Sequence, residues 1–287
     1  MNVGPDFICI GLPKAGTGWL FDQLNAHPDF WMPPVKELLY LKKPISKMRF
    51  VSRSGEPLPN PGDQERRIHR TELDARDRTF LRTAAACSGK PRDYGRYAEL
   101  FAPKGPLLSG DVSPPYWNLE DDVVEAVAER FPKTRIVLLV RDPVSRAWSR
   151  ISMAHRSGLF DAAIARDEAA LRAYLDDNRK IGTMRATQVA ERWRELAPKL
   201  SFGIFLFDDI AARPEDTLND ILLFLGADPA KMAGGLEAGF NRKAGEEKLP
   251  MGDVARAVLA ERFAEELRAS ASAFGGAAAG WAAKYGL

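Results

Sequence analysis

The stretch that most constrains the fold lies near the amino terminus, where residues 7–19 read FICIGLPKAGTGW. Phe7 to Ile10 are four consecutive apolar residues, which is typical of a buried strand. A glycine-rich turn with a single lysine, Lys14, follows, and leucines then recur at helical spacing. The stretch therefore predicts a strand, a tight turn and the start of a helix. Backbone amides and the helix dipole at such a start favour a phosphate-like anion.

The order of residues in this turn separates it from the P-loop of ATP and GTP hydrolases. That loop has the pattern G-x-x-x-x-G-K-[ST], in which the lysine follows the last glycine. Here Lys14 comes before Gly16 and Thr17. We therefore expect a loop that is built like a P-loop and holds an anion, but that does not have the sequence of a nucleotide hydrolase.

Composition sets broad limits on the class of protein. A chain of 287 residues is long enough for one large α/β domain with a sizeable core. The net charge of +2 gives no indication of nucleic-acid binding. The two cysteines, Cys9 and Cys87, are too few for a disulfide framework or a zinc site. The sequence has no signal peptide and no apolar run long enough to span a membrane, which predicts a cytoplasmic protein.

Strand and helix patterns alternate along the chain. The expected strands are residues 7–10, 135–140 and 202–207, with a further short apolar run at 106–108 between two glycines. The expected helices are residues 17–26, 119–131 with Asn118 as its N-cap, 214–225 stopped by Gly226, and 253–274. This alternation predicts a P-loop-like α/β domain whose central, mostly parallel sheet has helices on both faces. Such sheets bind ligands at the carboxyl ends of their strands.

One segment, residues 51–92, interrupts the alternation. It is polar, rich in Arg, Pro and Gly, and contains no convincing strand. Residues 42–106 hold 15 basic and 8 acidic side chains, a local net charge of +7. We consider two interpretations: a basic insertion that covers the mouth of the active site and its acceptor, or a solvated surface helix around residues 71–86.

A second anion signature follows the strand at 135–140, in the sequence RDPVSRAWSR. Asp142-Pro143 predicts the N-cap and first residue of a helix. Arg141 stands at the carboxyl end of the strand and Ser149 on the helix, so a guanidinium fork and a hydroxyl can grip one phosphate. Arg146 and Arg150 can equally form surface ion pairs, which is the preferred interpretation for Arg150.

Together the two loops resemble the sulfotransferase family that uses 3′-phosphoadenosine 5′-phosphosulfate (PAPS). The family's first loop, typically P-K-x-G-T-x-x-L, matches residues 13–20, and its second, R-[DN]-P-x-x-R-x-x-S, matches residues 141–149. MPPVKELLYL at 32–41 and GDVSPPYW at 110–117 resemble the carbohydrate branch typified by heparan sulfate sulfotransferases. The resemblance implies a single sulfotransferase domain over residues 1–287.

The resemblance also implies which residues hold the donor. The 5′-phosphosulfate is expected on the first loop, at Lys14, Ala15, Gly16, Thr17, Gly18 and Trp19. The 3′-phosphate is expected at Arg141 and Ser149, with a partial match to a further family loop at Arg242-Lys243. Lys14 is expected to stabilise charge on the leaving oxygen without any metal ion, and adenosine 3′,5′-bisphosphate is the expected product.

A base must take the proton of the acceptor hydroxyl. The carbohydrate branch uses a glutamate, and Glu37 matches it in the pair Lys36-Glu37. Lys36 is expected to orient the sulfate or an acidic acceptor and to favour ionisation of Glu37. Asp111 is the alternative base, and His155, about two turns beyond Ser149 on the same helix, is a further candidate near the acceptor. Ser113 is expected to contact substrate or donor.

The sequence therefore predicts an O-sulfotransferase that acts on a hydroxyl of a carbohydrate or small molecule. A nucleotide kinase is one alternative, because it would share the phosphate loop, but it should have the Walker A order that Lys14 and Gly16 lack. A non-catalytic nucleotide-binding module is the other. Such a module would have lost the base, so the presence of both Lys14 and Glu37 disfavours it.

Overall fold

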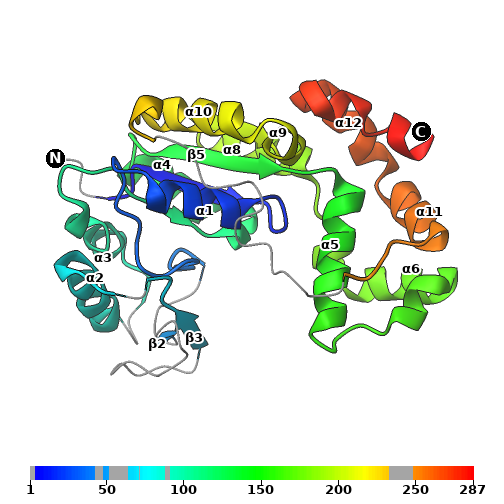
Figure 1. Ribbon diagram of the computed structural model, residues 1–287, viewed down its shortest axis with the longest axis horizontal. Helices are drawn as coiled ribbons and strands as arrows, with labels where there is room; N and C mark the ends of the chain where they lie inside the picture. The colour runs from blue at the N-terminus through cyan, green and yellow to red at the C-terminus, as the bar shows by residue number, and fades with distance from the viewer. Residues whose placement is uncertain (1–3, 43–47, 52–63, 71, 88–90, 233–247) are drawn as a thin grey trace.

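A four-stranded parallel sheet lies at the centre of the computed structural model, which describes residues 4–42, 48–51, 64–70, 72–87, 91–232 and 248–287 (Figure 1). The strand order is β4-β1-β5-β6. The strands are β1 (Phe7–Gly11), β4 (Gly110–Val112), β5 (Arg135–Val140) and β6 (Phe202–Leu206). Phe7 pairs in register with Gly110 on one side and with Arg135 on the other. All residues of β1 are buried, as continuous apolar strands of parallel sheets usually are.

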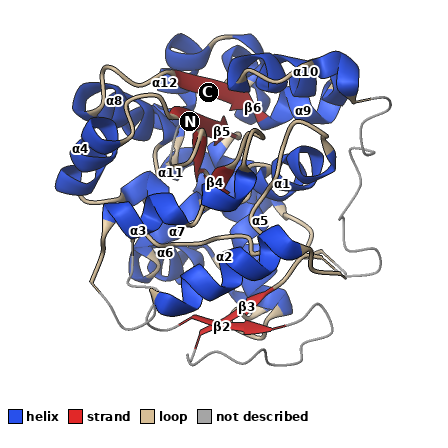
Figure 2. Ribbon diagram, turned by 90° about the vertical axis from the view of Figure 1, so that its left-hand side faces the viewer, coloured by secondary structure: helices blue, strands red, loops and turns tan. Residues whose placement is uncertain are grey.

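Helices cover both faces of this sheet (Figure 2). One face carries α1 (Thr17–Ala26), α9 (Phe207–Ala212) and α10 (Pro214–Leu225), and the other carries α4 (Asp121–Arg130) and α8 (Ala186–Leu196). The predicted α/β fold, with a parallel sheet between two helical layers, is confirmed.

Further helices extend the molecule at its two ends. The end beyond the carboxyl termini of the strands carries α5 (Pro143–Arg156), α6 (Glu168–Asp177), α7 (Arg179–Gly182), α11 (Asp253–Arg262) and α12 (Ala264–Phe274). The opposite end carries α2 (Ala75–Ala86), α3 (Tyr94–Glu99) and a separate parallel pair, β2 (Met48–Val51) and β3 (Gln64–Arg67). None of the described helices is long and apolar enough to cross a membrane.

Residues 51–92 were expected to hold no strand, and β3 corrects this. Its sequence, QERR, has no apolar alternation, so only pairing with a distant segment makes it a strand. Helix α2 is not simply a solvated helix either. Its Phe80 is fully buried and packs edge-on against Trp31, with ring centres 6.2 Å apart, and the Asp77 carboxylate accepts hydrogen bonds from Trp31 and Arg70.

Three element boundaries differ from the sequence expectation. The strand expected near 106–108 forms at Gly110–Val112, because Gly110 lets the chain approach Phe7 closely: a Cβ there would lie 2.5 Å from the Phe7 ring. The N-cap of α4 is Glu120 rather than Asn118, whose side chain accepts a hydrogen bond from Lys42.

The third difference divides the helix expected at 253–274. It breaks into α11 and α12 at Phe263, which is fully buried. The guanidinium groups of Arg185 and Arg146 lie 4.7 Å and 5.9 Å from the centre of the Phe263 ring, so this side chain packs against residues from distant parts of the sequence.

Candidate functional site

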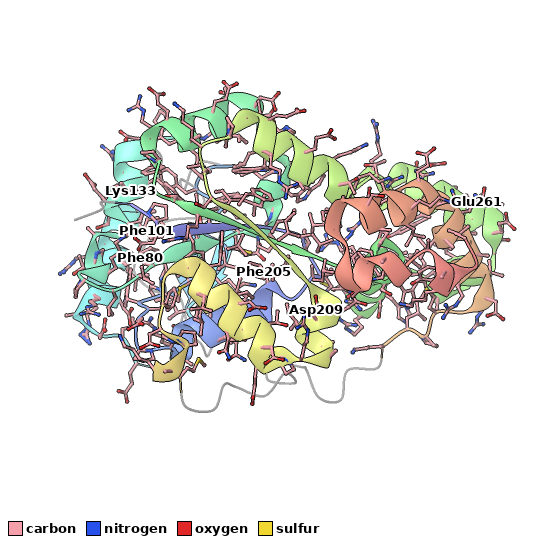
Figure 3. All side chains as sticks on the ribbon, turned by 90° about the horizontal axis from the view of Figure 1, so that it is seen from above. Phe80, Phe101, Lys133, Phe205, Asp209 and Glu261 are labelled. Atoms are coloured by element: carbon pink, nitrogen blue, oxygen red, sulfur yellow. The ribbon has the colours of Figure 1, made fainter. Side chains whose placement is uncertain are left out.

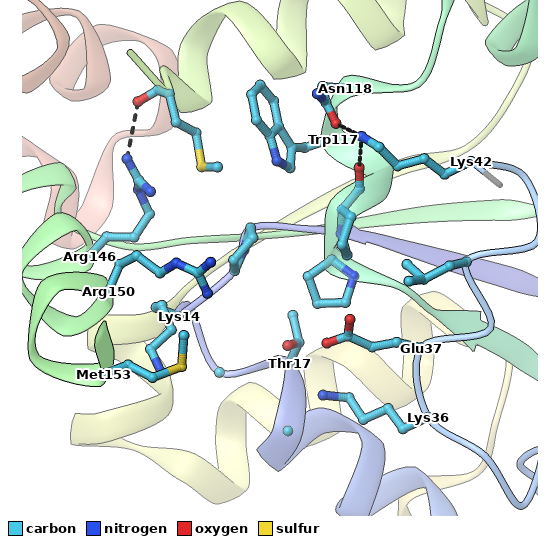
Figure 4. A pocket seen from close by; sticks show the side chains of 17 residues that line it. Lys14, Thr17, Lys36, Glu37, Lys42, Trp117, Asn118, Arg146, Arg150 and Met153 are labelled. Carbon is cyan, nitrogen blue, oxygen red and sulfur yellow. Dashed lines mark hydrogen bonds between the residues drawn. The ribbon is translucent and has the colours of Figure 1, made fainter. Parts of the chain in front are cut away.

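A cavity of about 540 Å³ opens beyond the carboxyl ends of β1, β4 and β5. In the sheet, β1 has β4 on one side and β5 on the other. The direction in which successive strands are added therefore reverses at β1. Ligands of open α/β sheets bind at such a reversal. The walls come from the loop after β1, the segment 36–42, the turn Pro114–Asn118 and helix α5 (Figure 4).

The loop after β1 brings Lys14 and the start of α1 to this cavity. Lys14 and Gly16 both have left-handed backbones, with φ of 70° and 97°. Gly16 is the N-cap of α1 and offers no side-chain cap, so the first amides of the helix face the cavity side without an intrahelical acceptor. The Lys14 ammonium donates to the thioether sulfur of Met153 at 3.4 Å, a weak acceptor. This is the geometry of an anion site.

The segment 36–42 supplies the only carboxylate among the described residues that line the cavity, Glu37. Figure 4 shows its side chain beside Lys36 and Thr17, which reach toward it from two different elements. Burial lowers the pKa of Lys36, and the neighbouring Glu37 carboxylate raises it in part. A carboxylate and the first residue of α1 thus meet at one point, although they are 20 residues apart in the sequence.

The cavity is strongly basic. Its cationic side chains are Lys14, Lys36, Lys42, Arg146 and Arg150. Arg146 is only 2% exposed and donates to the carbonyl oxygen of Met184 at 3.3 Å. Burial lowers the pKa of Arg146 to about 10, so its guanidinium is charged at neutral pH. Within the described ranges neither Arg146 nor Arg150 forms an ion pair with a carboxylate, so the positive charge is available to an anionic ligand.

Comparison with known proteins agrees with this arrangement. The model of the Sulfotransferase family matches residues 5–230. The chain belongs to this family. The matched range includes the loop after β1, the pair Lys36-Glu37 and helix α5. No curated protein gives a significant match to the sequence.

Two solved structures show the same fold as this sulfotransferase. A sulfotransferase from Alicyclobacillus acidocaldarius is 21% identical, with a TM-score of 0.63 over 96% of this chain and 98% of that one. The sulfotransferase domain of the Synechococcus PCC 7002 olefin synthase is 16% identical, with a TM-score of 0.50 over 92% of this chain and 95% of that domain. At these identities the likeness establishes the fold alone.

In this sulfotransferase the residues expected at the 3′-phosphate are placed apart from the main cavity. Arg141 donates to the backbone oxygen of Lys14 at 3.1 Å and stacks on Phe207 at 4.3 Å. It lines a second, shallower cavity of about 380 Å³ next to Lys284. Ser149 is half-buried and lines neither cavity. Arg242 and Lys243 lie outside the described residues.

The remaining predicted site residues lie at varied depths. Ala15 is fully buried, and Trp19 is 8% exposed under the loop, so only their backbones can serve a ligand. Gly18 lines the cavity. His155 does not line it, and its Nδ1 lies 2.9 Å from the carbonyl oxygen of Phe160. Asp111 and Ser113 are buried behind the segment 36–42 and do not line the cavity.

Sequence reasoning missed Arg146 and Arg150 as cavity residues. Arg150 was expected in a surface ion pair, but it lines the cavity of the sulfotransferase. The available signal was their spacing of four residues, which places both on one face of α5. Lys42 was also missed, because it lies after the matched motif and is held in place by Asn118 and the carbonyl oxygen of Pro115.

The helix that carries these arginines is fixed by Asp142, its N-cap. The Asp142 carboxylate, 1% exposed, accepts from the amides of Val144 and Ser145 and from Lys284 and Tyr285. Burial alone would raise its pKa, but the hydrogen bonds from Lys284 and Tyr285 hold the pKa of Asp142 below its ordinary value. The predicted N-cap and N1 pair, Asp142-Pro143, is confirmed.

We expect Asp142→Ala to lower the free energy of unfolding by about 2 kcal/mol, because it removes a cap and leaves buried donors unpaired. Asp167→Ala, which removes an exposed N-cap of α6, should cost about 1 kcal/mol or less.

The contribution of Asp142 to stability should also depend on pH. Since the folded pKa of Asp142 is depressed, this contribution is complete above the ordinary aspartate pKa of about 4 and is lost as pH falls through the lower folded value. Urea unfolding at pH 7 and pH 3 would measure both effects; equal losses in the two variants would contradict this role.

Proposed function

We propose that this sulfotransferase transfers the sulfuryl group of PAPS to a hydroxyl of a carbohydrate or small-molecule acceptor. The observation that carries the proposal is that Lys14, Thr17 and Glu37 all line one cavity, whose other charged side chains among the described residues are cationic. Figure 4 shows Glu37 beside Thr17 at the start of α1, while Lys14 extends toward Met153 on α5. The loop of the family motif and the proposed base thus face the same cavity from separate parts of the sequence.

The residues present fit a donor with several negative charges. The backbone amides of Gly16, Thr17, Gly18 and Trp19 would hold the 5′-phosphate at the positive end of α1. Arg141 and Ser149 follow the family motif for the 3′-phosphate, and Arg242-Lys243 would complete that site. The cationic lining supports this fit, because five cationic side chains around one cavity stabilise bound anions.

The proposed reaction is an in-line displacement. Bound PAPS supplies an activated sulfuryl group. Glu37 accepts the proton of the acceptor hydroxyl as the new oxygen–sulfur bond forms. The bond from sulfur to the bridging phosphate oxygen breaks, and Lys14 stabilises the negative charge that develops on that oxygen. Lys36, next to Glu37, offsets the charge of the sulfuryl oxygens. The products are a sulfate ester and adenosine 3′,5′-bisphosphate.

A screen of hydroxylated acceptors with ³⁵S-labelled PAPS tests this function. The screen should contain monosaccharides, oligosaccharides, phenols and alcohols, with Lys14→Met as the inactive control. We expect labelled sulfate ester to form together with an equal amount of adenosine 3′,5′-bisphosphate, and Lys14→Met to form far less of both. Transfer of phosphate from ATP to the same acceptors, with no sulfate transfer, would contradict the proposal and favour a kinase.

We expect Arg141→Ala to weaken binding of adenosine 3′,5′-bisphosphate by about tenfold or more, the scale for a charge-assisted pair. The same change removes the hydrogen bond to the Lys14 carbonyl oxygen, which adds to the loss. Arg213→Ala is the matched control, since Arg213 is exposed, lines neither cavity and, within the described part of the chain, forms its ion pair with Asp209. Calorimetric titration would measure both, and unchanged affinity in Arg141→Ala would remove Arg141 from the 3′-phosphate site.

A further inference from the structure

The segment that carries Glu37 has an unfavourable backbone. Glu37 and Leu39 both lie in the left-handed region, with φ of 62° and 54°, although neither is glycine. Each such residue costs about 1 kcal/mol or more and persists only where the surroundings fix it. The direction of the Glu37 side chain depends on this backbone. The structure must therefore contain contacts that hold the segment in place.

Two side chains hold the segment from the adjacent strand end. The hydroxyl of Ser113 accepts a hydrogen bond from the amide of Leu39 at 3.1 Å. The hydroxyl of Tyr116 accepts one from the amide of Leu41, also at 3.1 Å. Both hydroxyls are fully buried, so water cannot replace them. The segment is thus fastened at two alternate residues just beyond Glu37.

Both hydroxyls donate their single protons to one carboxylate, Asp111. Ser113 donates to Oδ1 at 2.6 Å and Tyr116 to Oδ2 at 2.8 Å. A third hydroxyl, that of Tyr97, donates to Oδ2 at 3.0 Å. A hydroxyl has one proton, so a group that donates it to Asp111 presents only lone pairs to the amides. Every proton in the network points toward Asp111, which is the arrangement that an anionic acceptor imposes.

We propose that Asp111 is a positioning residue for Glu37, acting through Ser113 and Tyr116 rather than on the acceptor. This inference rests on the proposed function of Glu37 as the base. Asp111 is 1% exposed and does not line the cavity, so no acceptor hydroxyl can reach it. The carboxylate is needed in its ionised form, because a protonated Asp111 or an asparagine would offer a donor where three hydroxyls already donate.

Some of the groups around Asp111 stabilise its ionised form and others oppose it. They are Cys9 on β1, Tyr97 on α3, Tyr116 in the turn after β4, and Glu37 with Lys36 on the segment it fastens. Burial raises the pKa of Asp111 to about 6, the three hydroxyl bonds lower it and Glu37 raises it. Burial also raises the pKa of Cys9 to about 12, so the thiol stays neutral. Asp111 is then mostly ionised at pH 7.5 and mostly protonated at pH 5.

Hydrogen exchange tests the inference independently of any enzymatic activity. We expect Ser113→Ala and Tyr116→Phe each to speed deuterium uptake in peptides covering residues 36–42 by about tenfold, and Asp111→Asn to do so more strongly. Ser109→Ala is the matched control: Ser109 is also fully buried next to β4, but its hydroxyl has no partner in the described part of the chain. In the wild type, protection of this segment should be lower at pH 5 than at pH 7.5 after correction for intrinsic exchange.

Kinetics then separate positioning from direct catalysis. Ser113→Ala and Tyr116→Phe should lower kcat about tenfold, with affinity for adenosine 3′,5′-bisphosphate unchanged and with thermal unfolding still cooperative. Uptake and kcat within twofold of the wild type in these two variants would overturn the inference. Loss of activity in Asp111→Asn with normal protection of residues 36–42 would also overturn it, because Asp111 would then act as a base. Faster uptake with no measurable sulfate transfer in any variant would uphold the positioning contact and reject the proposed function instead.

Discussion

Replacing Glu37 with glutamine is expected to lower kcat by a factor of about 10² to 10⁴, the range for loss of a general base. Glutamine has the same size and the same left-handed backbone requirement, so the segment 36–42 keeps its shape. Only the ability to accept a proton is removed. Steady-state kinetics with saturating PAPS and an acceptor identified in the screen would measure the loss.

The control for this variant is Glu99→Gln, which changes an exposed glutamate at the end of α3 that does not line the cavity. It should leave kcat within twofold of the wild type. Binding of adenosine 3′,5′-bisphosphate to Glu37→Gln should also be unchanged or slightly tighter, because a negative charge leaves a basic cavity. Wild-type turnover in Glu37→Gln would move the base to another group, and His155→Ala would then be the next variant to measure.

Lys14→Met is expected to lower kcat by about 10² to 10³, the scale for removing one stabiliser of developing charge. Methionine keeps most of the length of the side chain and removes its charge. The loss should fall on kcat more than on acceptor KM, since Lys14 is proposed to act on the leaving oxygen. Donor affinity should fall as well, because Lys14 is one of five cations in the cavity.

Lys133→Met provides the matched control, since Lys133 is exposed in the loop before β5 and far from the cavity (Figure 3). The loss of kcat can also be measured with a series of acceptors whose hydroxyl groups differ in pKa, with PAPS as the donor throughout. If Lys14→Met retained full kcat and raised only acceptor KM, Lys14 would be an acceptor contact and the proposed role on the leaving oxygen would be wrong.

The parts of the fold set by local sequence were predictable. The runs at 7–10 and 136–140 are apolar without interruption, and Asp142-Pro143 is a local capping signal, so each forms where the pattern places it. The parts set by distant contacts were not. The start of β4 depends on the fit of Gly110 against Phe7, and Phe263, where the expected helix breaks, packs against two arginines from distant parts of the sequence. No local pattern carries that information.

The candidate site shows the same division. The motifs placed Lys14 and Thr17 in the loop after the first strand and gave Glu37 from the Lys36-Glu37 pair, and the structure brings all three into one cavity. The sequence could not show that Arg146 is buried at this cavity, with no ion pair to a carboxylate among the described residues. Asp111 matched a strand-end acid and was considered as a base, but its burial behind three hydroxyls could be seen only after the segment 36–42 had folded against β4.

Calorimetric titration of the wild-type protein with adenosine 3′,5′-bisphosphate, compared with ADP, tests the central claim most directly. Both ligands carry two phosphate groups, but only the first matches the PAPS product, with one phosphate for the loop after β1 and one for Arg141 and Ser149. The account predicts that adenosine 3′,5′-bisphosphate binds at least about tenfold more tightly than ADP, that the difference disappears in Arg141→Ala, and that Mg²⁺ has no effect on it. Equal or tighter binding of ADP, strengthened by Mg²⁺, would contradict it.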